Sequence, residues 1–153
     1  MNYKAWGFIT ILMHFAGLAI GFAAILPHSP AHAAIYLALV VVTTLALVYS
    51  FCSKCPCHER QCSHVVLGPI ARILPRRKIS KYTSADYWGL GVSFFVPAVY
   101  QSRWLWKHDV LPLVFYPLFA ATIALILLKV CPECKNVNCP FNRHPRNPKC
   151  RRT

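Results

Sequence analysis

The eight cysteines of the chain are gathered in two short runs, and each run directly follows a hydrophobic segment. Cysteines that serve only apolar packing would instead be scattered through the apolar segments, because such thiols are among the most buried side chains. Both runs begin with a C-x-x-C pair, and thiolates at that spacing can bind a metal or exchange disulfides. The first run holds Cys52, Cys55, Cys57 and Cys62, and the second holds Cys131, Cys134, Cys139 and Cys150.

Each run supplies four thiols, which is the ligand number of structural zinc sites and of iron–sulfur clusters. The sequence therefore predicts that all eight cysteines are metal ligands, and it leaves open whether the cofactor is zinc or an iron–sulfur cluster. It also leaves open whether each run holds its own centre or whether one C-x-x-C from each run shares a metal.

Two local resemblances bear on the metal. The second run, read as C-x2-C-x4-C-x4-H through His144, resembles zinc-knuckle spacing with the last two ligand types exchanged, which implies zinc. Its Cys-Pro pairs, like the one in the first run, resemble the Cys-Pro ending of bacterial ferredoxin runs, which implies an iron–sulfur cluster, although the full ferredoxin spacing is absent. The pairs are Cys55-Pro56, Cys131-Pro132 and Cys139-Pro140.

The composition is that of a membrane protein. Hydrophobic residues make up 56% of the 153 residues and charged residues 14%, whereas a water-soluble domain is about a quarter charged. Three uncharged or nearly uncharged runs, Ala5–Leu26, Ala31–Phe51 and Val110–Val130, approach the roughly 20 residues that a helix needs to cross a bilayer. A fourth run, Tyr87–Tyr100, is shorter and is compatible with a re-entrant segment, but we interpret it as a spanning helix. The sequence predicts an all-α, integral membrane four-helix bundle built of two helical hairpins.

The two halves of the chain share one plan, in which two hydrophobic segments are followed by a cysteine run. We expect residues 1–51 to form a first transmembrane hairpin and residues 52–82 a cysteine-rich basic loop. Residues 83–130 then form a second hairpin, and residues 131–153 form a cysteine-rich basic tail. Because each half contains two spans, both cysteine runs are expected on one face of the membrane.

The basic residues predict which face that is. Of the 17 lysines and arginines, only Arg103 and Lys107 lie in the connections opposite to the cysteine runs. Lysine and arginine accumulate on the cytoplasmic side, so both termini, the loop and the tail are expected to be cytoplasmic, in a bacterial or archaeal cytoplasmic membrane. The net charge of +13 then reflects topology and contact with the lipid bilayer rather than nucleic-acid binding, which we do not expect.

The first hydrophobic run has one competing interpretation. Ala31-His32-Ala33 is an A-x-A pattern, and Lys4 can serve as a short positive region, as in a cleaved signal peptide. The run Ala5–Leu26 is longer than the apolar region of such peptides, so we expect it to remain as a span.

Other uses of the thiols are less consistent with the pattern. Disulfides are disfavoured in a reducing cytoplasm, palmitoylation is a further option for cysteines beside a membrane, and a thiol–disulfide oxidoreductase needs fewer than eight cysteines. No catalytic constellation is present, and none of the four acidic residues lies inside a hydrophobic run. We therefore expect no catalytic activity of the protein's own.

Four histidines form a second group of candidates. His14 lies near the middle of the first run, where an ionisable group is costly and often functional. We expect a hydrogen-bonded helix contact there, with haem ligation as the alternative. His28, His32 and His108 fall in or beside the connections on the outer side, where solvent exposure is the default and an outer metal site the alternative.

These observations favour a metal-binding membrane protein, most simply an electron-transfer subunit of a membrane redox assembly. An iron–sulfur cluster would then relay electrons between a cytoplasmic protein partner and a membrane partner. A zinc-stapled membrane scaffold or docking protein is the alternative, and a membrane thiol–disulfide oxidoreductase is a further one.

Overall fold

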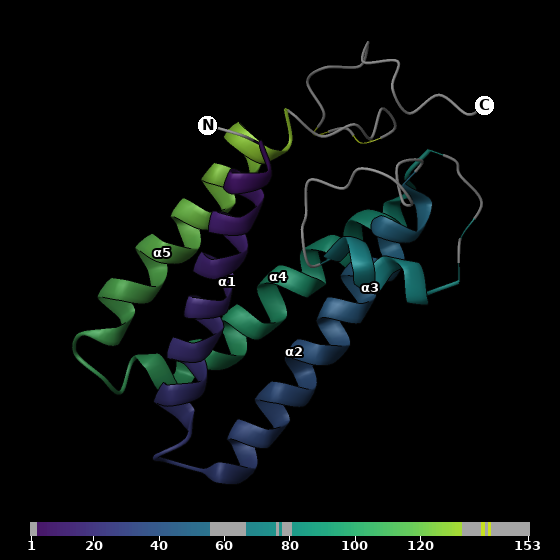
Figure 1. Cartoon of the computed structure of the whole chain (residues 1–153). Helices are drawn as coiled ribbons and strands as arrows, with labels where there is room; N and C mark the ends of the chain where they lie inside the picture. The colour runs from purple at the N-terminus through teal and green to yellow at the C-terminus, as the bar shows by residue number, and fades with distance from the viewer. Residues whose placement is uncertain are drawn as a thin grey trace.

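The structure is a computed structural model that describes residues 3–55, 67–75, 77, 81–132, 139 and 141. Within these residues all regular secondary structure is helical, and no strand is present. A 3₁₀ turn, η1, follows the second helix, and a π-helical turn, η2, ends the last one. The elements are α1 (Tyr3–Ile25), α2 (Pro30–Ser50), η1 (Cys52–Lys54), α3 (Leu67–Ile73), α4 (Ser84–Leu105), α5 (Leu111–Leu125) and η2 (Ile126–Val130) (Figure 1).

Three of the expected membrane helices are confirmed as helices long and apolar enough to cross a bilayer. These stretches are Ala5–Ile25, Pro30–Lys54 and Leu111–Val130. The fourth helix, α4, is 22 residues long and extends beyond both ends of the apolar run that predicted it. Its length is sufficient for a span, because 22 residues of α-helix rise about 33 Å, but it carries more polar residues than the other three.

The helix starts follow the local sequence. Ser29 precedes α2 with extended backbone angles, its side chain accepts a hydrogen bond from the backbone N–H of His32, and Pro30 occupies the first helical position. Thr83 caps α4 in a capping box, in which the Asp86 carboxylate accepts a hydrogen bond from the Thr83 backbone N–H at 2.8 Å.

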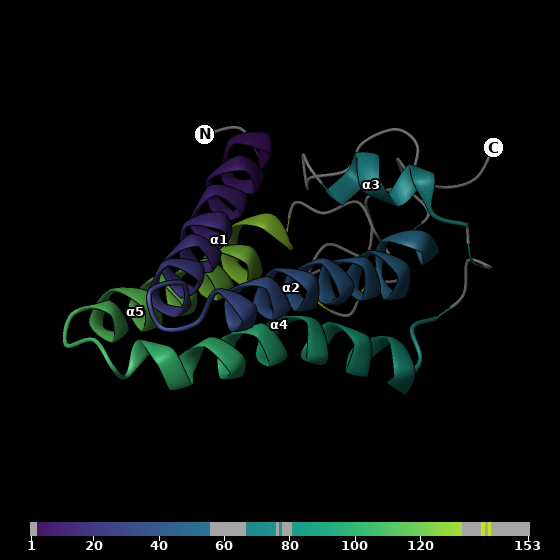
Figure 2. The ribbon, with the colours of Figure 1, turned by 90° about the horizontal axis from the view of Figure 1, so that it is seen from below.

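The helices pack mainly across the two halves of the chain. The most extensive contact is between α2 and α4, followed by that between α1 and α5, and α1 also crosses α4. The helices within each half, α1 with α2 and α4 with α5, have less contact, and Figure 1 shows them joined at the lower end by their connections. Figure 2 shows α2 lying along α4, with α1 running away from them at an angle. The described structure is therefore less a pair of hairpins than two crossing pairs of helices.

Helix α4 turns several polar side chains inward and several large apolar side chains outward. Asp86, Ser93 and Gln101 are buried, whereas Trp88 and Val99 are 74% and 69% exposed. A water-soluble helix has the opposite arrangement, with apolar residues toward the core. Burial of the polar side chains against neighbouring helices is what a helix surrounded by hydrocarbon requires.

Three helices meet at a buried hydrogen bond near the turn connections. The Tyr36 hydroxyl of α2 donates to Gln101 Oε1 of α4 at 2.6 Å. A Cβ atom on Gly21 of α1 would lie 1.6 Å from that oxygen, so only glycine allows α1 to approach this closely. Small residues commonly permit such close approach of helices in membrane proteins.

The last membrane helix ends in a wider turn. In η2 the backbone N–H of Cys131 donates to the carbonyl of Ile126 at 2.8 Å, five residues back instead of four. The turn packs on α1 and α5 and leads directly into the second cysteine run.

Candidate functional site

The two cysteine runs begin at the same end of the molecule, which we call the cysteine end. Figure 1 shows α2 and η2 both finishing at its upper side, where the chain also starts. Cys52 and Cys55 lie in and directly after η1, Cys131 directly follows η2, and these three and Cys139 are half-buried. The remaining predicted ligands lie outside the described residues: Cys57, Cys62, Cys134 and Cys150.

The starts of the two runs are apart from each other. η1 packs on α2 and α3, whereas η2 packs on α1 and α5, and the two turns do not touch within the described part of the chain. Among the same residues no group of three or more histidine, cysteine, aspartate or glutamate side chains is placed to hold a metal. The ligand sets predicted from the sequence are therefore not tested by this geometry, because half of each set falls outside it.

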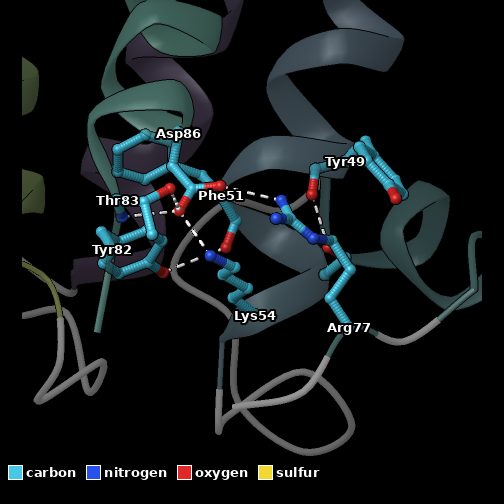
Figure 3. A network of polar contacts seen from close by, with 8 residues as sticks. Tyr49, Phe51, Lys54, Arg77, Tyr82, Thr83 and Asp86 are labelled. Carbon is cyan, nitrogen blue, oxygen red and sulfur yellow. Dashed lines mark hydrogen bonds and ion pairs between the residues drawn. The ribbon is translucent and has the colours of Figure 1, made fainter. Parts of the chain in front are cut away.

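A charged network fixes the first run to α4 (Figure 3). Lys54, the third residue of the Cys-Ser-Lys-Cys motif, is only 4% exposed, and its ammonium is paired with the carboxylate of Asp86, which is 1% exposed. Arg77 Nη1 donates to the other oxygen of the same carboxylate at 2.8 Å. The Thr83 hydroxyl and backbone N–H complete its hydrogen bonding. One buried carboxylate thus balances two cations, and the network carries a net positive charge.

Aromatic and backbone contacts support the same network (Figure 3). The Arg77 guanidinium lies 5.0 Å from the centre of the Tyr49 ring, and the Arg77 backbone N–H donates to the carbonyl of Ser53 at 3.3 Å. Tyr82 stacks on Phe51 with ring centres 4.6 Å apart, and its hydroxyl donates to the Phe51 carbonyl at 3.0 Å. The segment before α4 is therefore bound to the end of α2.

The electrostatics of Asp86 follow from these contacts. The two oxygens of the carboxylate accept hydrogen bonds from Lys54, Thr83 and Arg77. Two of these donors are cations, which stabilise the ionised form of the carboxyl and offset the cost of its burial.

Sequence reasoning missed this network. It counted Lys54 and Arg77 only among the 17 basic residues that indicate topology, and it proposed no partner for Asp86. A usable signal was present, because Asp86 is one of four acidic residues in a chain with 17 lysines and arginines. A carboxylate that scarce beside a membrane span is a strong candidate for pairing.

The predicted interior histidine lines a small cavity between the helices, whose wall is mostly apolar with a few polar side chains. The His14 ring meets Phe15 and Phe94 edge-on, with ring centres 6.4 and 6.0 Å apart. Residues of all four long helices line a cavity of about 30 Å³ next to it, which is room for about one water molecule. Its polar lining consists of His14, Thr43, Thr44, Ser93, Gln101 and Thr122.

The three histidines expected at the opposite end come together in space. His28 and His32 both lie against the ring of Trp104, and His108 lies against His28.

Comparisons of the chain with protein-family models, with curated proteins and with solved structures found no match, so its function is inferred from its own residues.

Proposed function

We propose that the protein is an integral membrane protein that binds metal through two cysteine runs on the cytoplasmic face of a bacterial or archaeal membrane. The observation that carries the proposal is that both runs leave helix ends at one end of the molecule. Eight thiols on one face, beside 15 of the 17 basic residues, form a concentrated site for a metal that prefers sulfur.

The proposal includes α4 as a fourth membrane span. Its inward polar residues are hydrogen-bonded, and its exposed face carries Trp88, Phe95 and Val99. This distribution suits hydrocarbon and is unfavourable in water. Four spans place both cysteine runs and the N-terminus on one side, and the distribution of basic residues makes that side cytoplasmic.

Two separate centres are the better arrangement of the ligands. η1 and η2 pack on different helices and do not touch in the described structure, which argues against one C-x-x-C from each run sharing a metal. Each run holds four cysteines of its own, the number that a zinc site or an iron–sulfur cluster takes. The ligand sets are Cys52, Cys55, Cys57 and Cys62 for the first centre and Cys131, Cys134, Cys139 and Cys150 for the second.

We favour iron–sulfur clusters and a role in electron transfer between a cytoplasmic protein and a membrane partner. A cluster beside a bilayer and surrounded by cationic side chains is positioned to receive an electron from a docked acidic partner. The protein residues would bind the cluster and adjust its potential through charge and hydrogen bonds. No step in this role requires the protein to have a catalytic activity of its own.

A structural zinc site is the second candidate, and the network of Lys54, Asp86 and Arg77 favours it. This network already fixes the first run to α4, so a closed zinc site there would complete a rigid docking surface. Structural zinc sites stabilise small loops in this way.

Metal analysis of anaerobically purified protein separates the candidates. Iron and sulfide in equal amounts, with visible absorption that dithionite bleaches, would support electron transfer. Colourless protein with stoichiometric zinc would support the docking protein and exclude the cluster. Metal-free protein with a reversible dithiol couple would support a thiol oxidoreductase instead.

Cysteine variants test the division into two centres. Cys131→Ser with Cys134→Ser should remove about half of the metal, and so should Cys52→Ser with Cys55→Ser, because each pair removes two of four thiolate ligands. Ser63→Ala, in the same loop as the first run, is the matched control and should retain all of it. Loss of all metal from either double variant would mean that the runs share one centre.

A further inference from the structure

A second group of side chains with ligand chemistry lies at the end of the molecule opposite to the cysteines, which we call the turn end. It comprises the connection between α1 and α2 and the connection between α4 and α5, both at the lower side of Figure 1. His28 comes from the first connection and His108 from the second. Their ring centres are 5.4 Å apart, although the residues are 80 positions apart in the sequence.

The indole of Trp104 supports this pair of imidazoles. Trp104 is buried, and His28 stacks on it with ring centres 5.7 Å apart and planes at 25°. His28 itself is exposed and His108 is half-buried, so a dissolved ion can reach both rings. The arrangement holds two metal-ligating groups close together and open to solvent.

The hydrogen bonds around the cluster separate the pair from its third histidine. His32 Nδ1 lies 2.9 Å from the hydroxyl of Tyr100, so that nitrogen is engaged. His108 Nε2 lies 3.5 Å from the carbonyl of Ala24. A proton on Nε2 would be oriented by this carbonyl, which leaves Nδ1 of His108 as a metal ligand in the manner common for metal-binding histidines.

We propose that His28 and His108 bind a divalent transition metal that prefers imidazole nitrogen, with water in the remaining positions. Neutral imidazole is the commonest metal ligand among side chains, and Cu²⁺ has the highest affinity of the first-row divalent ions for such a site. Metal–nitrogen bonds of about 2.0–2.1 Å fit between two rings at the observed separation. The site is independent of the cysteine centres, because it uses different residues at the other end of the molecule.

One neighbouring charge opposes the metal. The Lys107 ammonium lies 4.4 Å from the centre of the Trp104 ring, on which His28 also stacks, so its charge acts on an ion bound at His28. Removing this positive charge should therefore strengthen binding, by an amount that added salt reduces. A gain in metal affinity after removal of the Lys107 charge would therefore distinguish a site at the turn end from metal bound elsewhere on the protein.

The test uses Cu²⁺ with the full-length protein in detergent, after its thiols have been alkylated with N-ethylmaleimide. Binding is followed by quenching of tryptophan fluorescence and by nitrogen hyperfine structure in the electron paramagnetic resonance spectrum. His28→Gln and His108→Gln should each weaken binding by at least about 10-fold, and Lys107→Gln should strengthen it. His32→Gln is the matched control, since it removes a third imidazole of the same cluster, and it should leave the affinity unchanged.

Two outcomes would overturn the proposal. The first is Cu²⁺ affinity that does not change in His28→Gln, an exposed position whose substitution leaves the buried core intact. The second is a loss in His32→Gln as large as that in His28→Gln. Trp104→Phe checks the location, because it should reduce the fluorescence quenching while the hyperfine signal of bound Cu²⁺ remains.

Discussion

The α2–α4 pair and the α1–α5 pair are held together in different ways. Polar contacts occur along the full length of the first pair: Lys54 with Asp86 at one end, Ser93 with the Thr43 carbonyl at 2.7 Å in the middle, and Tyr36 with Gln101 toward the other end. In the second pair the Phe115 ring lies against Gly17, where an added Cβ would be 3.6 Å from it. The hydroxyl of Thr122 donates to a carbonyl of its own helix.

The difference follows from the composition of α4. A helix with several polar side chains is stable in hydrocarbon only when those side chains find partners, and α2 supplies them. Hydrogen bonds have directions, so they fix the register of the pair more strictly than apolar packing does. The first cysteine run follows the pair with the fixed register. The second run follows the pair in which apolar packing predominates among the described residues.

The largest expected effect comes from removing the carboxylate of the charged network. Asp86→Ala leaves Lys54 buried without its partner, and we expect a loss of about 3–5 kcal/mol in the free energy of unfolding. The measurement is chemical unfolding in mixed detergent micelles. Asp109→Asn, an exposed aspartate at the turn end, is the control and should change little. A loss below that of the interior hydrogen-bond variants would mean that the network does not hold the α2–α4 pair.

A smaller effect is expected where α1 crosses the α2–α4 pair. Gly21→Ala places a methyl group against the Tyr36–Gln101 hydrogen bond, and we expect a loss of about 1–3 kcal/mol from overpacking. Gly17→Ala is the matched control, because its methyl group would meet Phe115 at ordinary contact distance. Equal losses in the two variants would show that close approach to Tyr36 and Gln101 is not what makes Gly21→Ala unfavourable.

The interior hydrogen bond should contribute less than the charged network. A double-mutant cycle with Tyr36→Phe and Gln101→Leu should give a coupling energy of about 0.6–1.7 kcal/mol, the range measured for interhelical hydrogen bonds in membrane proteins. The free energies of unfolding of the two single variants and the double variant provide it. A coupling energy near zero would mean that this hydrogen bond does not stabilise the α2–α4 pair, and that its other contacts hold it together.

The smallest effect is expected in the α1–α5 pair. Thr122→Val removes a hydroxyl that bonds only within its own helix in the described structure and keeps the side-chain shape, so stability should change by less than about 0.5 kcal/mol. Ser93→Ala is the comparison across the other pair, since the Ser93 hydroxyl reaches the Thr43 carbonyl of α2. A larger loss of stability in Thr122→Val than in Ser93→Ala would contradict the proposed difference between the α1–α5 pair and the α2–α4 pair.

Local features of this fold were predictable from the sequence, and long-range ones were not. Uncharged runs predicted α1, α2 and α5 within a few residues, because hydrocarbon length sets their extent. The apolar run Tyr87–Tyr100 is shorter than α4. The helix continues through polar residues such as Asp86 and Gln101, because their side chains form hydrogen bonds with other parts of the fold. Pairing of α2 with α4 depends on contacts between residues 32 to 65 positions apart, which no local pattern encodes.

The candidate site was predictable only in part for the same reason. The spacing of cysteines is visible in the chain, so their gathering behind two helices could be inferred. Their distance from one another depends on how the helix pairs cross. The approach of His28 to His108 likewise depends on two connections that meet only in the folded molecule.

The π-helical turn η2 sets the direction in which Cys131, the first residue of the second cysteine run, leaves the helix axis. Its backbone bond spans five residues, so the turn holds one residue more than an α-helical turn would. Each residue turns an α-helix by about 100°. If the same five residues continued as a regular α-helix, Cys131 would therefore be rotated by about 100° about the helix axis relative to its present position. Deleting one residue of Ile126–Val130 should instead restore a regular helix and leave Cys131 facing nearly the same way, because its N–H already bonds to the Ile126 carbonyl. The direction in which the chain leaves this helix at Cys131 thus depends on a single inserted residue.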